Sequence, residues 1–172
     1  MDLQMRELSM DRVQELEEYR AEIIASGNTD GSGGICRGDC AADWVREQLQ
    51  NRSVIHEGYR MTKEVYLLID TDRDKVVGIG NFRYDLHPDY LQGVGHIGYS
   101  IRPSERGKGF GKLILKYLLQ IAERRCQKDL ILTCAVGNER SRRTILACGG
   151  EYLGNVINVF TEREVERYRI KL

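Results

Sequence analysis

The sequence has no excess of charge of either sign, because 26 Lys and Arg residues balance 26 Asp and Glu residues. Without a net basic field, the chain has no overall electrostatic attraction for nucleic acid. Basic residues do cluster at 124–125 and within 140–143. We interpret these clusters as solvated helix faces, with a binding patch as the alternative. We therefore expect no nucleic-acid partner.

Long apolar runs are also lacking. None approaches the ~18 residues that a membrane span requires, and residues 1–7 contain no apolar signal region. Hydrophobic residues make up 41% of the chain and charged residues 30%, which suits a globular protein. We expect a cytoplasmic protein without membrane contact. Its 172 residues favour one domain over 1–172, large enough to bury a core without disulfides.

The five cysteines include no C-x-x-C pair. The close pair is Cys36 and Cys40, whose spacing lies outside the usual redox pattern. It is weak evidence for zinc because no second pair follows. We expect free thiols and no metal.

Two common nucleotide-binding signatures are missing from the glycine-rich stretch 106–111 (RGKGFG). A Walker A loop would need a glycine where Arg106 stands and a Ser or Thr where Leu113 stands. The dinucleotide fingerprint G-x-G-x-x-G fails because the glycines run G-x-G-x-G.

That stretch nevertheless has the properties of an anion site. It follows a strand-like segment, 95–101, and precedes an apolar pattern with helical spacing from Phe110 to Ala122. The first amides of a helix have no internal partner, and the helix dipole adds positive charge there. Glycines let phosphate oxygens approach those amides, and Arg106 and Lys108 add charge.

The pattern R-x-x-G-x-G, formed by Arg106, Gly109 and Gly111, resembles the pyrophosphate loop of the GNAT superfamily of N-acetyltransferases. Further segments resemble the same family: the strand end and proline turn at 101–106, the strand 130–136, Asn138 and Ser141 after it, and the helix-ending glycines after Cys148. Together they cover residues 76–154, the cofactor-binding half of the family. The amino-acid sequences of segments 95–99 and 101–106 also resemble those of a bacterial subgroup of predicted acetyltransferases.

The resemblance implies an α/β fold with a mixed, mostly antiparallel sheet and helices on both faces. Its fourth and fifth strands, here 95–101 and 130–136, would splay apart. It also implies acetyl-CoA as co-substrate. The residues expected to bind it are Ile101, Arg106, Gly107, Lys108, Gly109, Phe110, Gly111, Lys112, Asn138 and Ser141. Asn138 is alternatively a helix N-cap.

The transfer of acetyl to an amine calls for a base, because only the free amine attacks the thioester. We predict His96 as that base, since its ordinary pKa suits proton transfer near neutrality; a structural histidine is the alternative. Many family members carry a Tyr four residues after the position of Ser141, as proton donor to the thiolate. Here Ile145 stands there. Tyr99, Tyr152, Ser141 or water are the candidate replacements. We take Tyr99, together with His96, as a catalytic candidate.

The acceptor side is predicted from Asn81 and Arg83, which alternate with Phe82 on a strand and so share a face. An exposed strand edge is the alternative. The Gly-rich loop 26–38 could close over the acceptor, and Asp30 and Asp39 would suit a cationic amine. A plain flexible loop is the competing interpretation.

The leading function is acetyl transfer from acetyl-CoA to the amine of a small molecule or peptide. A CoA-binding sensor without transferase activity and a nucleotide-phosphate module are the rivals, and a homodimer is left open.

The remaining elements are predicted from periodicity and turn signals. Helices are expected from a cap at Ser9 or Asp11 to Gly27 and over 39–51. Strands are expected over 3–8, 64–70, 76–84, 155–160 and 164–172, and a loop or helical turn over 85–94.

Overall fold

The computed structural model describes residues 2–27, 29 and 32–172. Their strands and helices follow one another along the chain in the order β1 (Leu3–Glu7), α1 (Val13–Ala25), α2 (Ala41–Gln50), β2 (Ser53–His56), β3 (Tyr59–Asp70), β4 (Lys75–Tyr84), α3 (Pro88–Gly93), β5 (Ile97–Ile101), α4 (Phe110–Arg124), β6 (Asp129–Ala135), α5 (Glu139–Ala147), β7 (Glu151–Ile157) and β8 (Glu164–Lys171). Short 3-10 turns at Met10–Arg12 and Pro103–Glu105 precede α1 and α4.

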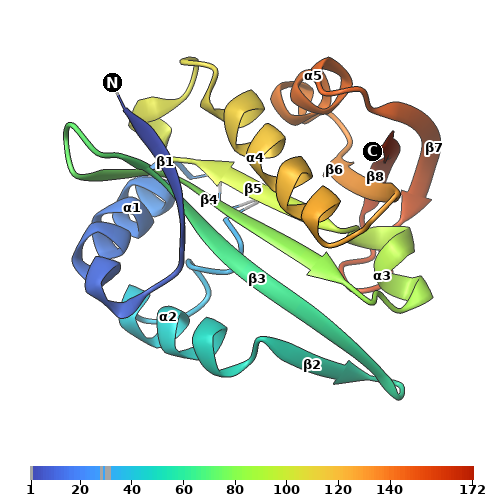
Figure 1. Ribbon diagram of the computed structural model, residues 1–172, viewed down its shortest axis with the longest axis horizontal. Helices are drawn as coiled ribbons and strands as arrows, with labels where there is room; N and C mark the ends of the chain where they lie inside the picture. The colour runs from blue at the N-terminus through green and yellow to red at the C-terminus, as the bar shows by residue number, and fades with distance from the viewer. Residues whose placement is uncertain (1, 28, 30–31) are drawn as a thin grey trace.

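The strands form two antiparallel sheets (Figure 1). The larger has the order β1-β3-β4-β5, with β2 paired to the far end of β3, and the smaller has the order β6-β8-β7. Helix α4 lies over one face of the larger sheet, and α1 and α2 lie over the other. The mixed α/β class, the antiparallel sheet and the separation of 97–101 from 129–135 confirm the predicted fold.

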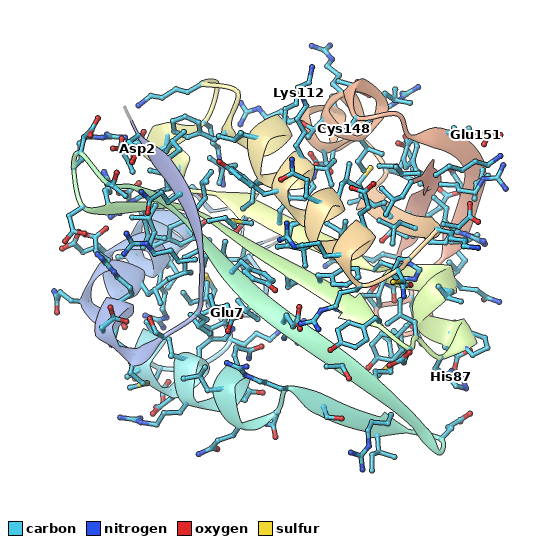
Figure 2. All side chains as sticks on the ribbon, in the orientation of Figure 1. Asp2, Glu7, His87, Lys112, Cys148 and Glu151 are labelled. Carbon is cyan, nitrogen blue, oxygen red and sulfur yellow. The ribbon has the colours of Figure 1, made fainter. Side chains whose placement is uncertain are left out.

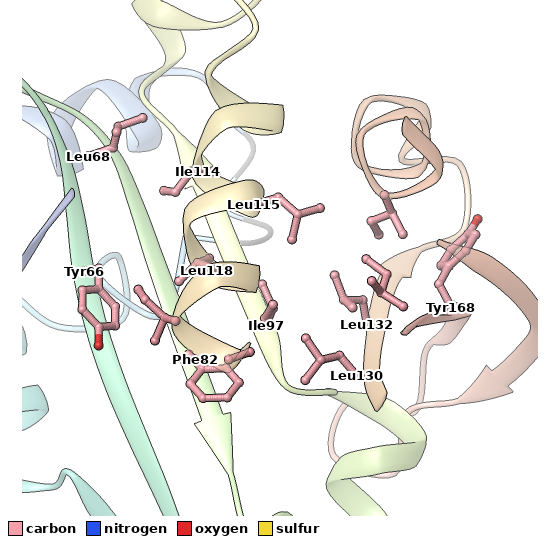
Figure 3. Close-up of a cluster of buried hydrophobic side chains, with 14 of the residues drawn as sticks. Tyr66, Leu68, Phe82, Ile97, Ile114, Leu115, Leu118, Leu130, Leu132 and Tyr168 are labelled. Carbon is pink, nitrogen blue, oxygen red and sulfur yellow. The ribbon is translucent and has the colours of Figure 1, made fainter. Parts of the chain in front are cut away.

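Helix α4 joins the two sheets through its apolar stripe. Ile114, Leu115 and Leu118 are fully buried. They share one core cluster with Phe82 and Ile97 of the larger sheet, and with Leu130, Leu132 and Tyr168 of the smaller. Figure 3 shows Leu130 and Leu132 of the smaller sheet beside the helix and Tyr168 farther from it. Burial of each such side chain contributes ~1.5–3 kcal/mol, so this helix is the main apolar link between the sheets.

The opposite face of the larger sheet is covered by a second core cluster, which includes Leu16 and Tyr19 of α1 and Val45 of α2. A buried charge reinforces it. Arg102, directly after β5, is only 2% exposed, and its guanidinium contacts three carboxylates of α1: Glu22 at 2.7 Å, Glu15 at 3.2 Å and Glu18 at 3.3 Å. It also donates to the Val76 carbonyl at 3.2 Å. The arginine of the resembling strand-end segment thus fixes α1 to the sheet.

Three strands differ from the sequence-based expectation. Strand β2 was not predicted, and β3 begins at 59 rather than 64. The hairpin between them turns on Glu57 and Gly58, with φ of 47° and 84°. Positive φ at both central residues is the turn type that usually carries Asn-Gly or Asp-Gly, so a Glu-Gly turn gives a weak signal. Strand β7 begins at 151 rather than 155 because a bulge between Tyr152 and Gly154 interrupts its pattern.

Within the described ranges, no helix combines the length and apolar character needed to cross a membrane.

Candidate active site

The two sheets touch at one end of β5 and then part. A single bridge pairs Gly95 with Leu132, and the His96 amide donates to the Ile131 carbonyl at 2.7 Å. Gly95 is required at this contact, because a Cβ there would lie 2.5 Å from the Ile131 carbonyl oxygen and φ is 74°. Beyond it, a cleft of about 710 Å³ opens, lined by Tyr99 and Ile101 of β5 and by Thr133 and Cys134 of β6.

The backbone of β5 directs unpaired amides into this gap. Arg102 donates its amide to the Val77 carbonyl of β4 at 2.9 Å. Hydrogen bonding alternates along an antiparallel ladder, so Gly98 and Ser100 also point their amides toward β4. The amides of Tyr99 and Ile101 therefore point the other way, into the gap.

The glycine-rich turn closes one end of the cleft, before α4. Gly107 and Gly109 have φ of 82° and 83°, a conformation that favours glycine. A Cβ at either position would meet no atom within 4 Å, so the space in front of the turn is open. Within the described chain, the amides of Gly109, Phe110 and Gly111 make no hydrogen bond. This turn therefore offers a group of free donors to an anion.

The two basic residues of the turn behave differently. Arg106 lines the cleft and donates its Nε to the Ile101 carbonyl at 3.2 Å. Lys108 points away from it and binds the buried Glu105 carboxylate at 2.7 Å. Glu105 also accepts two hydrogen bonds from Arg73, at 2.8 and 3.0 Å. The Arg73 guanidinium and the Lys108 ammonium lower the pKa of Glu105 to about 2. The contacts of Lys108 therefore brace the turn.

Of the predicted cofactor-binding residues, the cleft brings together Ile101, Arg106, Gly107, Gly109, Phe110, Gly111, Lys112, Asn138 and Ser141, together with Tyr99. Lys108 is outside its lining. Figure 2 shows Lys112 where α4 approaches α5, close to Cys148. His96, Asn81 and Arg83 do not line the cleft. His96 lies at its closed end, and Asn81 and Arg83 lie on the face of β4 that α1 and α2 cover.

His96 holds the two sheets together at that closed end. Its Nδ1 accepts a hydrogen bond from the Ile131 amide at 2.9 Å. The lone pair that a base would use is thereby occupied, and the proton of the neutral ring lies on Nε2. The side chain is 7% exposed, and burial lowers its pKa. These contacts favour the structural interpretation of His96, and its role as a base stays a prediction.

Asn81 and Arg83 face the side of the larger sheet covered by α1 and α2, as the alternation predicts. A Cβ on Gly33, in the loop before α2, would lie 3.8 Å from the Asn81 amide nitrogen. That loop is anchored by Ile35, which is fully buried, and by the Trp44 indole, which donates to the Gly33 carbonyl at 3.2 Å. The predicted loop over the acceptor side thus packs on β4. Asp39 is exposed, and Asp30 lies outside the described residues.

The sequence matches the model of the acetyltransferase (GNAT) family over residues 38–149, which is more than half of the chain. The chain belongs to this family. The assignment confirms the resemblance drawn from the glycine-rich turn, and it makes the protein an acyltransferase. No curated protein matches the sequence significantly.

Solved structures of N-acetyltransferases share the fold. One is an acetyltransferase from Salmonella typhimurium that modifies the N-terminal serine of ribosomal protein L7/L12, with 18% identity over 99% of this chain and 95% of that one, and a TM-score of 0.70. Another is a spermidine N-acetyltransferase SpeG chimera from Vibrio cholerae and hSSAT, with 14% identity, coverage of 99% and 96%, and a TM-score of 0.68. A third, the microcin C7 self-immunity acetyltransferase MccE in complex with acetyl-CoA and AMP, has 13% identity, coverage of 99% and 93%, and a TM-score of 0.69. At these identities the likeness shows the fold alone.

In this member of the GNAT family, Ile145 is 1% exposed and lines the cleft where many members have a tyrosine. Strand β5 contributes a hydroxyl to the same cleft. Tyr99 Oη lies 3.3 Å from Ser141 Oγ of α5, and burial raises the pKa of Tyr99 to about 12. Tyr99 therefore stays protonated at neutral pH and can donate a proton. Tyr152, another candidate, is 53% exposed and outside the cleft lining.

Asn138 is the N-cap of α5, because its Oδ1 accepts from the Ser141 amide at 3.2 Å. It also lines the cleft, so its two interpretations are compatible.

Several cleft residues were missed by sequence reasoning. Arg140 and Arg143 of α5 line the cleft, although we interpreted their cluster as a solvated face, with a binding patch as the alternative; their place in the first turns of a helix after a family-like Asn was the available signal. Asn158 and Arg163 come from the turn between β7 and β8. Asn158 Nδ2 donates to the Gly93 carbonyl at 2.8 Å, a long-range contact that no local pattern indicates.

Among the described residues, one group brings three potential metal-ligand atoms within 4.8 Å of one another: Glu57, His87 and Asp89. His87 is the N-cap of α3, and its Nδ1 accepts from the Asp89 amide at 3.3 Å. Because this cap and the adjacent carboxylates account for the grouping, we assign it no function.

Proposed function

We propose that this protein transfers an acetyl group from acetyl-CoA to the amine of a small molecule or peptide by direct attack. The observation that carries the proposal is the cleft between β5 and β6, with free amides along one wall and the glycine-rich turn at its end. N-acetyltransferases of the same fold act on a ribosomal protein or on spermidine.

The residues present fit coenzyme A. The turn before α4 offers unpaired amides in open space, which suits a pyrophosphate. Arg106, Arg140 and Arg143 add positive charge around the same cleft. Apolar groups of Ile97, Leu132 and Ile145 line its inner part and suit a pantetheine arm.

Bound acetyl-CoA supplies a thioester that an amine can attack. The amides of Tyr99 and Ile101 are positioned to polarise its carbonyl, since preorganised donors stabilise the charge that develops on the oxygen. As the nitrogen–carbon bond forms, the carbon–sulfur bond breaks, the nitrogen loses a proton and the thiolate leaves. We propose Tyr99, which lines the cleft with its hydroxyl 3.3 Å from Ser141 Oγ, as the residue that protonates that thiolate.

A second function, a CoA-binding sensor without transferase activity, is favoured by Ile145 at the usual tyrosine position and by the hydrogen-bonded His96. Turnover separates the two. The purified protein with acetyl-CoA and a panel of amines should release free thiol and yield acetylated amine. Tyr99→Phe should lower that turnover ~10²-fold, the low end for general acid catalysis, with acetyl-CoA affinity retained. Binding of acetyl-CoA without acetylation of any amine would favour the sensor.

We also infer a cytoplasmic location for the protein. The five cysteines are free thiols, which suits a reducing compartment. A single domain over 1–172 remains our proposal, as does the possibility of a homodimer.

A further inference from the structure

The face of the larger sheet that α1 and α2 cover carries two cations side by side. Lys63 of β3 and Arg83 of β4 are direct partners in the antiparallel register, so their side chains leave the same face of the sheet. A third cation, Arg37 of the loop before α2, repels Lys63 electrostatically. Like charges placed opposite each other on a sheet are destabilising. Such a pair is therefore expected to have a compensating partner.

The described chain supplies no such partner. No carboxylate within it forms an ion pair with Lys63, Arg83 or Arg37; Glu47 attracts Lys63 without pairing to it. Arg83 donates one hydrogen bond, from Nη1 to the Gly95 carbonyl at 3.2 Å, and a guanidinium has five donors. Burial and the neighbouring guanidinium lower the pKa of Lys63 to about 8, and burial lowers that of Arg83 to about 10. Lys63 and Arg83 are thus partly desolvated, and neither has an ion-pair partner within the described chain.

A second observation points to a ligand on the same face. Asn81, two residues before Arg83, is 4% exposed, and its Oδ1 is closed off from solvent with no hydrogen-bond partner in the described chain. Buried amide groups normally have partners, because an unpaired one costs ~1–3 kcal/mol. Asn81 also pairs directly with Gly98, which lines the cofactor cleft where the strands part. The unpaired amide therefore belongs to the register partner of a residue that lines the cleft.

We propose that the acceptor is a small amine whose other end is anionic, a carboxylate or phosphate, with the amine beside Asn81 and Gly98 and the anion on Lys63 and Arg83. This inference rests on the proposed transferase function and names its substrate class. The spacing is suitable, since two residues along a strand span ~7 Å. Polyamines are excluded by the same cations. That Asp30 and Asp39 suit a cationic amine stays a prediction.

Matched acceptors test the proposal directly. 4-Aminobutanoate is compared with its neutral amide, and O-phosphoethanolamine with ethanolamine, with 1,4-diaminobutane as the cationic member. The wild-type protein should acetylate the anionic member of each pair with a kcat/KM ~10- to 100-fold higher, because a hydrogen bond to a charged group contributes ~1.5–3 kcal/mol. The difference should lie mainly in KM.

Lys63→Met and Arg83→Gln should each reduce this preference, whereas Lys116→Met and Arg124→Gln, exposed on α4, should leave it intact. Lys63→Glu should shift the preference toward 1,4-diaminobutane. A thermal shift with acetyl-CoA verifies that each variant is folded. Equal use of both members of a pair by the wild-type protein would overturn the proposal, as would a wild-type preference for the diamine. A preference for the anionic member that survives in both Lys63→Met and Arg83→Gln would also overturn it.

A binding measurement separates this inference from the proposed function. Succinate, which has the anionic group but no amine, should bind the wild-type protein in the presence of coenzyme A and bind Lys63→Met at least ~10-fold more weakly in calorimetry. If no amine is acetylated but succinate binds in this way, the transferase function fails and the anion site stands. If succinate binds neither protein, the anion site is refuted whatever the turnover.

Discussion

At the scale of single residues, the site depends on a few positions where backbone geometry leaves no choice. Gly95 brings β5 within contact of β6, and His96 seals that contact by accepting from the Ile131 amide. Two residues further on, the strands have separated enough to form a cleft. The closing end of the gap therefore determines where the thioester can lie.

Gly95→Ala should destabilise the protein strongly. The added Cβ would lie 2.5 Å from the Ile131 carbonyl oxygen, at a φ of 74° that side chains rarely adopt. We expect a loss of at least ~2 kcal/mol in the free energy of unfolding, measured by urea titration. Gly27→Ala is the matched control, since Gly27 has a φ of 68° but open space around it, and it should cost ~1 kcal/mol. Equal losses in the two variants would contradict the close approach.

His96→Asn separates the two roles of His96. Asn retains an acceptor near the Nδ1 position but does not titrate. Burial lowers the pKa of His96 in the fold, so the unfolded chain binds the proton more readily. Stability should then fall as pH drops below about 6.5, the ordinary pKa of His. In His96→Asn this fall in melting temperature between pH 7 and 5 should be shallower.

Turnover of the same variant gives the second readout. A structural His96 predicts that His96→Asn retains most activity per folded molecule. A catalytic base predicts a loss of ~10²-fold at saturating substrate, partly recovered at high pH as the acceptor amine deprotonates.

At the scale of elements, the helices are fixed to the sheets by different forces. Helix α4 relies on apolar burial against both sheets, whereas α1 adds the buried contact of three carboxylates with Arg102. Both contacts fix β5 and the residue that follows it against the helices. A rigid strand is required if its amides are to act as preorganised donors.

Arg102→Met should cost ~1–3 kcal/mol in the free energy of unfolding, because the buried Val76 carbonyl and three partly exposed carboxylates lose the guanidinium that they bind. Urea titration measures it, and Arg124→Met, exposed on α4, should change stability by less than ~0.5 kcal/mol. Arg102→Lys should fall between the two, since one ammonium cannot reach all three carboxylates. A loss below ~1 kcal/mol in Arg102→Met would show that apolar packing alone holds α1.

How well the sequence predicts the structure also differs from one element to the next. The turn before α4 and the flanking strand and helix were predicted because glycine spacing and apolar periodicity are local signals, whereas the splayed pair of strands was predicted only from the resemblance to the GNAT family. The β2–β3 hairpin was missed because Glu57 is an unusual residue at positive φ. Asn158 and Arg163 were missed because the return of the chain from β7 to β8 brings them to the cleft through contacts distant in sequence.

At the scale of the whole molecule, the protein consists of two sheets with a ligand-sized gap between them. The glycine-rich turn and the arginines of α5 line the gap, whereas Asn81, Arg83 and Lys63 lie outside its lining, on the face of the larger sheet that α1 and α2 cover. The sequence predicted the glycine-rich turn from its motif, but not the arginines of α5. Lys63 and Arg83 are distant in sequence, and only the register of β3 with β4 places them together.

A ligand in this gap should stabilise the entire molecule, because it contacts both sheets in the native state only. Acetyl-CoA at 100 times its dissociation constant contributes ~2.7 kcal/mol. For a protein of this size each kcal/mol raises the melting temperature by ~2–4 °C, so we expect a rise of ~5–10 °C in a thermal melt. ATP at the same concentration should give a smaller shift, since it lacks the pantetheine arm that would fill the inner cleft.

Gly109→Glu should abolish the shift with acetyl-CoA, because it places a carboxylate where the pyrophosphate would lie. The substitution also strains a residue with φ of 83°, so Gly27→Glu, with φ of 68° and no contact to the cleft, is the control for strain. Gly27→Glu should lower the melting temperature of the free protein to a similar extent but keep the full rise with acetyl-CoA. If Gly109→Glu folds and keeps that rise, the phosphates bind elsewhere, and the turn before α4 is only a connection between β5 and the helix.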